Sequence, residues 1–234
     1  MNDLEVRLKK IKTRIKEASK GIDEPLLLAV SKVQPITKIE KLRDLGLTHF
    51  GESYLQEALA KVEHFKNSDI VWHFIGPIQS NKTRQIAEHF DWVHSVCSVK
   101  VARRLSSQRP ESMPPLNICL QINIDNETTK SGIFPDQAAE LYQEVVSLPN
   151  LALRGLMCLP KKQENSEDAS ASFQRMVALK DSLDANMDTL SMGMSADLEY
   201  AIKEGSTIVR IGTALFGERE PVVRQEKPVA EEAL

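Results

Sequence analysis

Lys32 is the residue whose type and position most directly suggest chemistry. It follows the apolar run Leu26–Val30 and Ser31, and a run of this kind is typical of a buried strand. A lysine at the end of such a strand brings an amine to the rim of a core, where partial desolvation disfavours the ammonium form. A neutral amine can condense with an aldehyde to form a Schiff base. On this segment alone, the simpler interpretation is a lysine that ends the strand and points to water.

Two segments nearer the C-terminus combine glycine with hydroxyl side chains in a way that suits phosphate. They are SMGMS at 191–195 and RIGT at 210–213. Glycine lets backbone N–H groups approach an anion closely, and hydroxyls add further donors. The residues that could do this are Ser191, Gly193, Ser195, Gly212 and Thr213. Either segment alone could be an ordinary turn, and Ser195 is also expected to cap the helix that follows it.

The elements that must position these residues alternate regularly along the chain. Short apolar runs predict strands at 26–32, 48–52, 71–75, 92–97, 117–124, 151–159, 189–194 and 208–213. Amphipathic segments predict helices that include 4–19, 36–45, 54–65, 82–89, 137–147, 171–184 and 196–204. Alternating strands and helices predict parallel strands joined by right-handed crossovers. The count matches an α/β fold of the (β/α)8 barrel type, with a doubly wound sheet as the alternative.

A barrel would bring the candidate residues to one mouth. Functional groups of such barrels lie at the C-terminal ends of the strands, and phosphate is often bound between the loops after strands seven and eight. Side chains alternate along a strand, so that Lys32 shares a face with Val30, and Arg210 shares one with Gly212. If these faces point inward, the sequence predicts a Schiff-base lysine, a phosphate site and an arginine around one ligand. A phosphorylated aldehyde would fit between them.

Composition limits the domain organisation and the partners. The chain has 234 residues with 41% hydrophobic content, enough for one large domain. We expect this domain to cover 1–217 and 218–234 to be a loose tail, with the polar segment 161–170 as a surface loop. The formal net charge is −3 with both signs interspersed, which does not indicate a nucleic-acid surface. No apolar run is long enough for a membrane span, and the N-terminus is unlike a signal peptide.

Cysteine and histidine do not suggest a disulfide framework or a metal site. The three cysteines, Cys97, Cys119 and Cys158, are scattered without a CxxC pair, which is typical of the reducing cytosol. No histidine or cysteine recurs at the spacing of zinc ligands. His73 lies in the middle of a predicted strand and is expected to be a packed, hydrogen-bonded core residue rather than a catalyst.

The sequence resembles the pyridoxal phosphate homeostasis proteins (the YggS/PROSC family), from about Leu4 to Gly217. The motifs that carry the resemblance are LLAVSK at 27–32, FGE at 50–52, YLQE at 54–57, WHFIGPIQSNK at 72–82, QINID at 121–125, KSGI at 130–133, RGLM at 154–157, LSMGMS at 190–195 and GSTIVRIGTALFG at 205–217. Family members usually carry Asn where this chain has Ser53, and Ala-Ile-Pro where it has Cys158-Leu159-Pro160.

The resemblance implies a single-domain barrel of the alanine racemase N-terminal-domain type. It implies that Lys32 carries pyridoxal 5′-phosphate (PLP) as an internal aldimine. It implies phosphate contacts from Ser191, the turn Gly193-Met194-Ser195, Gly212 and Thr213, and places Arg210 near the pyridine nitrogen. The departures at Ser53 and Cys158 touch neither the lysine nor the phosphate residues.

Two features of the sequence favour a protein that carries the cofactor over an enzyme that uses it to convert a substrate. An arginine beside the pyridine nitrogen disfavours its protonation and makes the ring a poorer electron sink. The chain also has only 17 residues after Gly217, too few for the second domain that supplies the opposite acid/base in two-domain racemases. We therefore expect a cytoplasmic PLP-binding protein that takes part in vitamin B6 homeostasis. Its possible partners are PLP-dependent apo-enzymes, and it would be a monomer or weak homodimer. The alternatives are a PLP-dependent amino-acid racemase or lyase, and a Schiff-base aldolase acting on a sugar phosphate.

Overall fold

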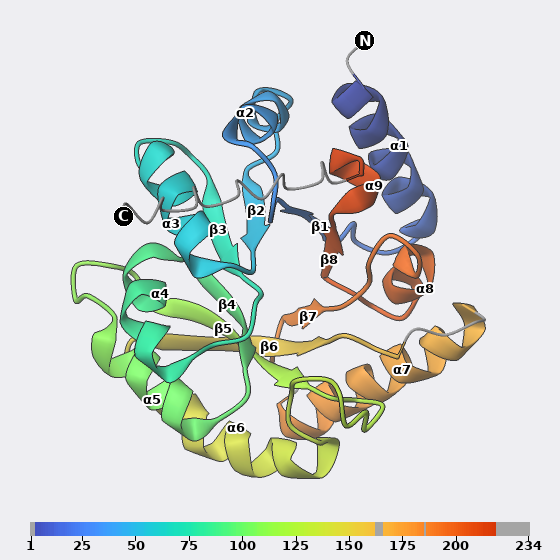
Figure 1. Ribbon diagram of the computed structural model, residues 1–234. Helices are drawn as coiled ribbons and strands as arrows, with labels where there is room; N and C mark the ends of the chain where they lie inside the picture. The colour runs from blue at the N-terminus through green and yellow to red at the C-terminus, as the bar shows by residue number, and fades with distance from the viewer. Residues whose placement is uncertain (1–2, 162–165, 185, 219–234) are drawn as a thin grey trace, which may run out of the picture.

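Eight short strands close into a parallel barrel in the computed structural model, which describes residues 3–161, 166–184 and 186–218 (Figure 1). Each strand pairs with the next, and β8 pairs with β1. The strands are β1 Leu26–Val30, β2 His49–Glu52, β3 Val71–Phe74, β4 Trp92–Val96, β5 Leu116–Ile122, β6 Leu151–Cys158, β7 Thr189–Ser191 and β8 Ile208–Ile211. The predicted (β/α)8 barrel is confirmed, and the doubly wound sheet is excluded.

Helices surround the barrel and connect successive strands (Figure 1). They are α1 Asp3–Ala18, α2 Ile36–Asp44, α3 Leu55–His64, α4 Thr83–His89, α5 Val99–Gln108, α6 Ala138–Val146, α7 Ser166–Leu183, α8 Leu198–Lys203 and α9 Thr213–Phe216, with short 3-10 turns at Ser80–Lys82 and Pro135–Gln137. The loop predicted for 161–170 is wrong from Ser166 onward, because a polar segment that contains Glu and Ala can begin a helix as readily as a loop. The expected tail 218–234 lies, apart from Glu218, outside the described residues.

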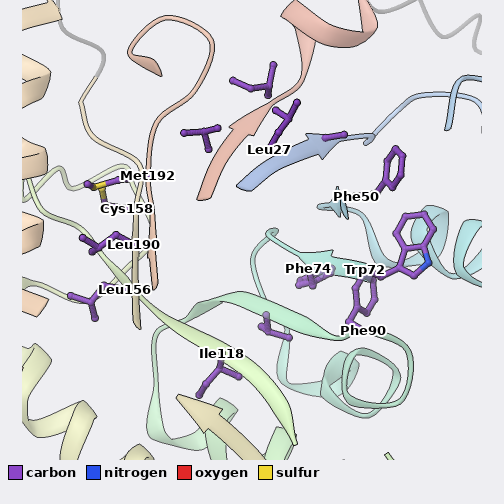
Figure 2. Packing of buried hydrophobic residues seen from close by; sticks show 14 of the residues in the cluster. Leu27, Phe50, Trp72, Phe74, Phe90, Ile118, Leu156, Cys158, Leu190 and Met192 are labelled. Carbon is purple, nitrogen blue, oxygen red and sulfur yellow. The ribbon is translucent and has the colours of Figure 1, made fainter. Parts of the chain in front are cut away.

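Two layers of side chains account for the packing. Outward-facing strand residues such as Phe50, Trp72 and Ile118 meet the helices in a continuous apolar core (Figure 2). The alternate strand residues face the barrel interior, where buried apolar side chains such as Leu28 and Ile208 lie outside that core. The same interior also holds buried polar side chains, among them His73, His94 and Arg210.

Helix α1 fastens the last segments of the chain to the barrel. It packs against α8 and α9 (Figure 1). Arg14 forms an ion pair with Glu199 at 2.6 Å and donates a hydrogen bond to the carbonyl oxygen of Ser195 at 3.0 Å. The first helix therefore supports the segment between β7 and α8. Within the described part of the chain, no helix combines the length and apolar character needed to cross a membrane.

Candidate functional site

A cavity of about 380 Å³ opens at the C-terminal ends of the strands, and we call it the mouth cavity. It is lined by Val30, Lys32, Gln34, Ser53, Ile75, Met157, Leu159, Met194, Ser195, Ala196, Arg210, Gly212 and Thr213. Six of the residues predicted from the sequence are therefore together in one place. Two others, Ser191 and Gly193, are not part of its lining. Sequence reasoning missed Gln34 and Met157, although Gln34 lies just after the strand predicted at 26–32 and Met157 lies near the end of the one predicted at 151–159, where lining residues are expected.

A buried ionic group that we call the Lys61 cluster, made of Lys61, Glu52 and Glu57, lies behind the segment that carries Lys32. The Lys61 Nζ is 2.7 Å from Glu52 Oε1 and 2.5 Å from Glu57 Oε1. Lys61 and Glu52 are almost completely buried, at 3% and 0% exposure. Burial raises the pKa of the Glu52 carboxyl, and the charge of Lys61 opposes this rise. Charges at this depth persist only when paired.

The Lys61 cluster holds the backbone on both sides of Lys32. Before it, Ser31 offers its carbonyl oxygen to Lys61 at 2.7 Å and donates its hydroxyl to Glu52 at 2.6 Å. After it, the Val33 N–H donates to Glu57 Oε1 at 2.7 Å. Val33 has φ of +60°, a conformation that a β-branched residue adopts only when its surroundings impose it. Lys32, two residues beyond the end of β1, is thus directed into the mouth cavity by fixed neighbours.

Arg210 lies at the floor of the mouth cavity and is 4% exposed. Its Nη1 donates to two oxygens of Ser191, the backbone carbonyl oxygen and, at 2.7 Å, the side-chain Oγ. Its Nη2 donates to the carbonyl oxygen of Cys158 at 2.7 Å. Burial lowers the pKa of this guanidinium, but an arginine remains charged in proteins. Of its five N–H groups, two have no partner among the described residues.

The segment from β7 to α8 differs in detail from the sequence prediction. Gly193 has φ of +92°, and a Cβ added there would lie 2.5 Å from the Cβ of Ala201. This glycine is therefore required by the turn itself. The Met194 N–H donates to Asp197 Oδ1 at 2.5 Å, and Asp197, not Ser195, occupies the N-cap position of α8. The expected capping role of Ser195 is wrong because the helix begins two residues later, which leaves Ser195 lining the mouth cavity.

The end of β8 provides the other side of the mouth cavity. Gly212 follows the strand, and α9 begins at Thr213. A Cβ added at Gly212 would lie 3.6 Å from Val30, an ordinary contact, so that the fold itself tolerates a side chain there. The hydroxyls of Ser195 and Thr213 donate to no other described residue, and both residues line the mouth cavity. These hydroxyls are therefore the donors best placed for an anionic group.

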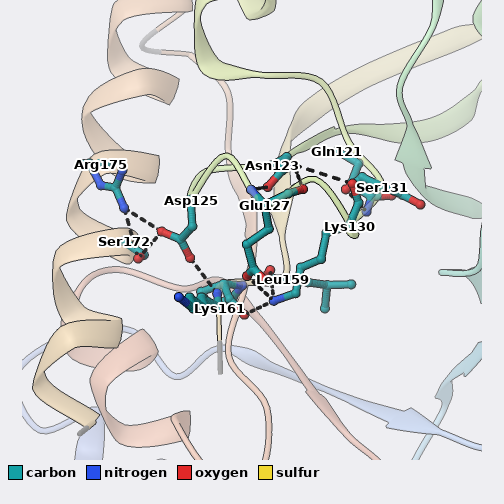
Figure 3. Close-up of polar contacts among 11 residues, drawn as sticks. Gln121, Asn123, Asp125, Glu127, Lys130, Ser131, Leu159, Lys161, Ser172 and Arg175 are labelled. Atoms are coloured by element: carbon teal, nitrogen blue, oxygen red, sulfur yellow. Dashed lines mark hydrogen bonds and ion pairs between the residues drawn. The ribbon is translucent and has the colours of Figure 1, made fainter. Parts of the chain in front are cut away.

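Polar contacts fix the segment that follows β5 against α7 and the end of β6 (Figure 3). Asp125 accepts hydrogen bonds from Ser172 at 2.7 Å and from the Lys161 N–H at 2.6 Å, and pairs with Arg175 at 2.6 Å. The Lys130 amine donates to the carbonyl oxygens of Leu159 and Pro160, at 3.2 and 2.6 Å. These contacts hold Leu159, one wall of the mouth cavity.

His73 is a packed core residue, as the sequence analysis expected, and Cys158 is buried as well. Both are completely buried. His73 is hydrogen-bonded to two other histidines, and burial raises the pKa of the Cys158 thiol to about 12. Neither lines the mouth cavity.

Comparison with known proteins gives a consistent assignment. The family model described as "Alanine racemase, N-terminal domain" matches residues 6–220. The pyridoxal phosphate homeostasis protein of Pseudomonas aeruginosa is 51% identical over 224 residues, which cover 94% of this chain and 97% of that protein. The protein of the same name from Escherichia coli K12 is 44% identical over 94% of this chain and 98% of its own length.

Solved structures agree with the sequence matches. PipY of Synechococcus elongatus, solved with PLP bound, superposes with a TM-score of 0.81 at 32% identity and covers 92% of this chain and 100% of its own. Alanine racemase from Corynebacterium glutamicum, at 16% identity and a TM-score of 0.68, shares the fold, and the match covers 63% of that longer chain. The chain belongs to the alanine racemase N-terminal domain family and, within it, to the pyridoxal phosphate homeostasis proteins.

Proposed function

We propose that this protein binds pyridoxal 5′-phosphate in the mouth cavity and holds it for intracellular vitamin B6 homeostasis and delivery. One observation carries the proposal: Lys32, Arg210 and the hydroxyls of Ser195 and Thr213 line the same cavity. PLP carries an aldehyde, a ring nitrogen that accepts hydrogen bonds, and a phosphate. The lining offers an amine, a guanidinium and hydroxyl donors, and this set fits the three groups.

The bound cofactor supplies an aldehyde that condenses reversibly with a lysine amine, with the loss of one water molecule. Lys32 is the residue we assign to this bond, because it is the lysine that lines the mouth cavity. The Lys61 cluster keeps the backbone of residues 31 and 33 in place. Lys130 lies nearby, but its amine is directed to two carbonyl oxygens and to Glu127 at 2.9 Å.

The phosphate is assigned to the segment around Ser195 and to Gly212 and Thr213. The side-chain hydroxyls would donate to it, and Gly212 leaves room for its oxygens to approach the backbone. Met194 lines the same side, with its own N–H already bonded to Asp197. Ser191 is reassigned: its hydroxyl is buried beneath Arg210 rather than exposed to the cavity.

The residues that line the mouth cavity suit a protein that holds PLP better than an enzyme that converts a substrate. A racemase or lyase needs a group on the face opposite the lysine that can give and take a proton. Among the described residues, Lys32 and Arg210 are the only ionisable side chains that line the mouth cavity, and arginine keeps its proton. An aldolase on a sugar phosphate would also need a proton-transfer group. The same lining therefore argues against both alternatives.

The state of the cysteines supports a cytoplasmic location. The three cysteines are free thiols in the structure, which suits a cytoplasmic protein. PLP-dependent apo-enzymes are the recipients that a carrier of this kind would serve. The protein would act as a monomer or weak homodimer.

Reduction with borohydride tests the anchor. Treatment of the PLP-loaded protein, followed by peptide mapping, should place the pyridoxyl label on the peptide that contains Lys32. The Lys32→Ala variant should lose the label, whereas Lys130→Ala, the matched control at the rim, should keep it. Label on another lysine in the wild-type protein, with none on Lys32, would show that the cofactor is held elsewhere.

A further inference from the structure

Five polar side chains form a continuous hydrogen-bonded chain through the interior of the barrel. It begins at Arg210, whose Nη1 is 2.7 Å from Ser191 Oγ. Ser191 Oγ is 2.8 Å from His94 Nδ1, and His94 Nε2 is 2.8 Å from His73 Nδ1. His73 Nε2 is 2.9 Å from His49 Nδ1. His49 is the first residue of β2 and is half-buried, so that the chain runs from the cavity floor to the opposite end of the barrel.

The direction of these hydrogen bonds can be derived from their first member. Arg210 can only donate, so Ser191 Oγ accepts. The Ser191 hydroxyl proton then needs an acceptor, and His94 Nδ1 is the partner that the described residues offer. An unpartnered buried hydroxyl would be costly. His94 therefore carries its proton on Nε2.

The same rule extends to the other two imidazoles. His94 Nε2–H donates to His73 Nδ1, and His73 Nε2–H donates to His49 Nδ1. Every acceptor lone pair in the chain thus points toward Arg210, and every donated proton points away from it. The ring of His73 is also stacked on Trp92, with centroids 5.5 Å apart and planes 9° from parallel, which fixes its orientation.

The surroundings of His94, His73 and His49 favour the neutral form of each imidazole. Burial lowers the pKa of His73 well below its usual range, with the neighbouring histidines contributing. Burial and the positive charge of Arg210 lower the pKa of His94 to about 3. Burial also lowers the pKa of His49, opposed by the charge of Asp91.

Arg210 needs such support because it is a buried cation. Among the described residues, no carboxylate forms a direct ion pair with it; its hydrogen-bond partners are neutral oxygens, and the charge of Asp197 acts on it only from beyond ion-pair distance. A buried charge without a counter-charge in contact is unstable unless dipoles are aligned to stabilise it. Hydrogen bonds that point the same way along a chain strengthen one another in a low-dielectric interior. The aligned chain behind Ser191 provides this stabilisation.

We infer that Ser191 and His94 are positioning residues for Arg210, and that the Ser191–His94–His73–His49 chain holds this guanidinium with two N–H groups left for the ligand. The inference rests on the proposed function where it concerns PLP, since Arg210 would donate to the ring nitrogen. The residues of this hydrogen-bonded chain come from β2, β3, β4, β7 and β8, so that it also ties opposite sides of the barrel to the cavity floor.

Nitrogen-15 NMR of the ligand-free protein tests the chain without the cofactor. His94 and His73 should show protonated Nε2 and unprotonated Nδ1 between about pH 6 and 8, where free histidine titrates near 6.5. A proton on Nδ1 of His94, or titration of His94 in this range, would overturn the inference. This result does not depend on whether PLP binds.

Binding of PLP tests the positioning role. Ser191→Ala should weaken PLP binding by at least about 10-fold and shift the absorbance maximum of the bound cofactor, because the donor at the ring nitrogen moves. Thr189→Val, which removes another buried hydroxyl of β7 outside the chain, should do neither. His94→Phe keeps a ring but removes the acceptor for Ser191, and it should reproduce the Ser191→Ala spectrum if that variant does not fold.

The outcomes separate this inference from the proposed function. If the wild-type protein binds PLP, and the PLP spectrum and affinity are unchanged in Ser191→Ala and His94→Phe, the positioning role is overturned. Loss of stability without a spectral change would show that these residues serve only the fold. If the wild-type protein binds no PLP, the proposed function fails, and the NMR result alone decides whether the chain holds Arg210 as inferred.

Discussion

The glycines of the two candidate phosphate segments serve different purposes. Gly193 adopts φ of +92°, and a Cβ there would collide with Ala201, so that the turn after β7 cannot form with another residue. Gly212 has neither constraint, since an added Cβ meets Val30 only at 3.6 Å. Gly212 lines the mouth cavity. The turn after β7 therefore requires glycine at position 193, whereas the fold does not require it at position 212.

Thr213 provides a test of the phosphate contact at the scale of one hydroxyl. Thr213→Val keeps the shape of the side chain but removes a donor to a dianion. A hydrogen bond to a charged group contributes roughly 1.5–3 kcal/mol, so that PLP affinity should fall by about 10- to 150-fold. Affinity for pyridoxal, which lacks the phosphate, should stay unchanged. Equilibrium titration followed by absorbance measures both.

The control for this prediction is Thr37→Val, which alters an exposed threonine on α2 and should change neither affinity. If the wild-type protein binds pyridoxal as tightly as PLP, the segments around Ser195 and Thr213 are ordinary turns. Equal losses of affinity for both aldehydes in Thr213→Val would point to a change in the shape of the site instead.

At the scale of elements, the ends of β1 and β2 are joined to α3 by the Lys61 cluster. Lys61→Met would leave the Glu52 carboxylate buried without its cation. Removing one partner of a buried ion pair typically costs about 3–5 kcal/mol. We expect a loss of this size in the free energy of unfolding, measured by urea denaturation. The additional change Glu52→Gln should recover part of it, because the uncompensated charge is then removed.

Lys66→Met is the matched control for this cluster. Lys66 pairs with Glu63 at the surface, with side chains 60% and 69% exposed, and its loss should change the free energy of unfolding by no more than about 0.5 kcal/mol. If Lys61→Met were as mild as this control, the cluster would not be what fixes the backbone around Lys32.

At the scale of the whole molecule, the barrel matches only part of the chain of alanine racemases. The match to the Corynebacterium glutamicum enzyme covers 63% of that protein. In the described residues, the mouth cavity has no proton-transfer group opposite Lys32. Loss of one well-placed general acid/base removes roughly two to four orders of magnitude in rate. We therefore predict that the protein retains PLP without rapid turnover of amino acids.

Exchange at the Cα position tests this conclusion. PLP-loaded protein incubated with L-alanine or L-serine in deuterium oxide should incorporate negligible deuterium at Cα, as followed by proton NMR. Free PLP at the same concentration sets the background. Rapid exchange over many turnovers that disappears in Lys32→Ala would identify the protein as an enzyme.

The sequence by itself determined the order of the barrel and the ends at which its chemistry lies. Alternating apolar and amphipathic segments specify parallel strands, whose C-terminal ends must meet at one mouth. Lys32, Arg210 and Thr213 could be assigned to that mouth for this reason, and the structure brings them to one cavity. The beginning of α7 at Ser166 could not be predicted, because polarity alone does not distinguish a loop from a helix.

Only the tertiary structure decided which inward-facing residues touch. Strand alternation shows that Ser191 and His73 face the interior. The height of each residue along the barrel axis depends on the stagger between strands, and no local sequence pattern predicts that stagger. The sequence predicts a phosphate contact for Ser191; in the structure its hydroxyl accepts a hydrogen bond from Arg210, and Ser191 does not line the mouth cavity. Lys61, one of many helical lysines, likewise gained its role only when closure of the barrel buried it beside Glu52. Contacts between segments distant in sequence arise from the closed shape, and they hold the cavity that the sequence could only locate.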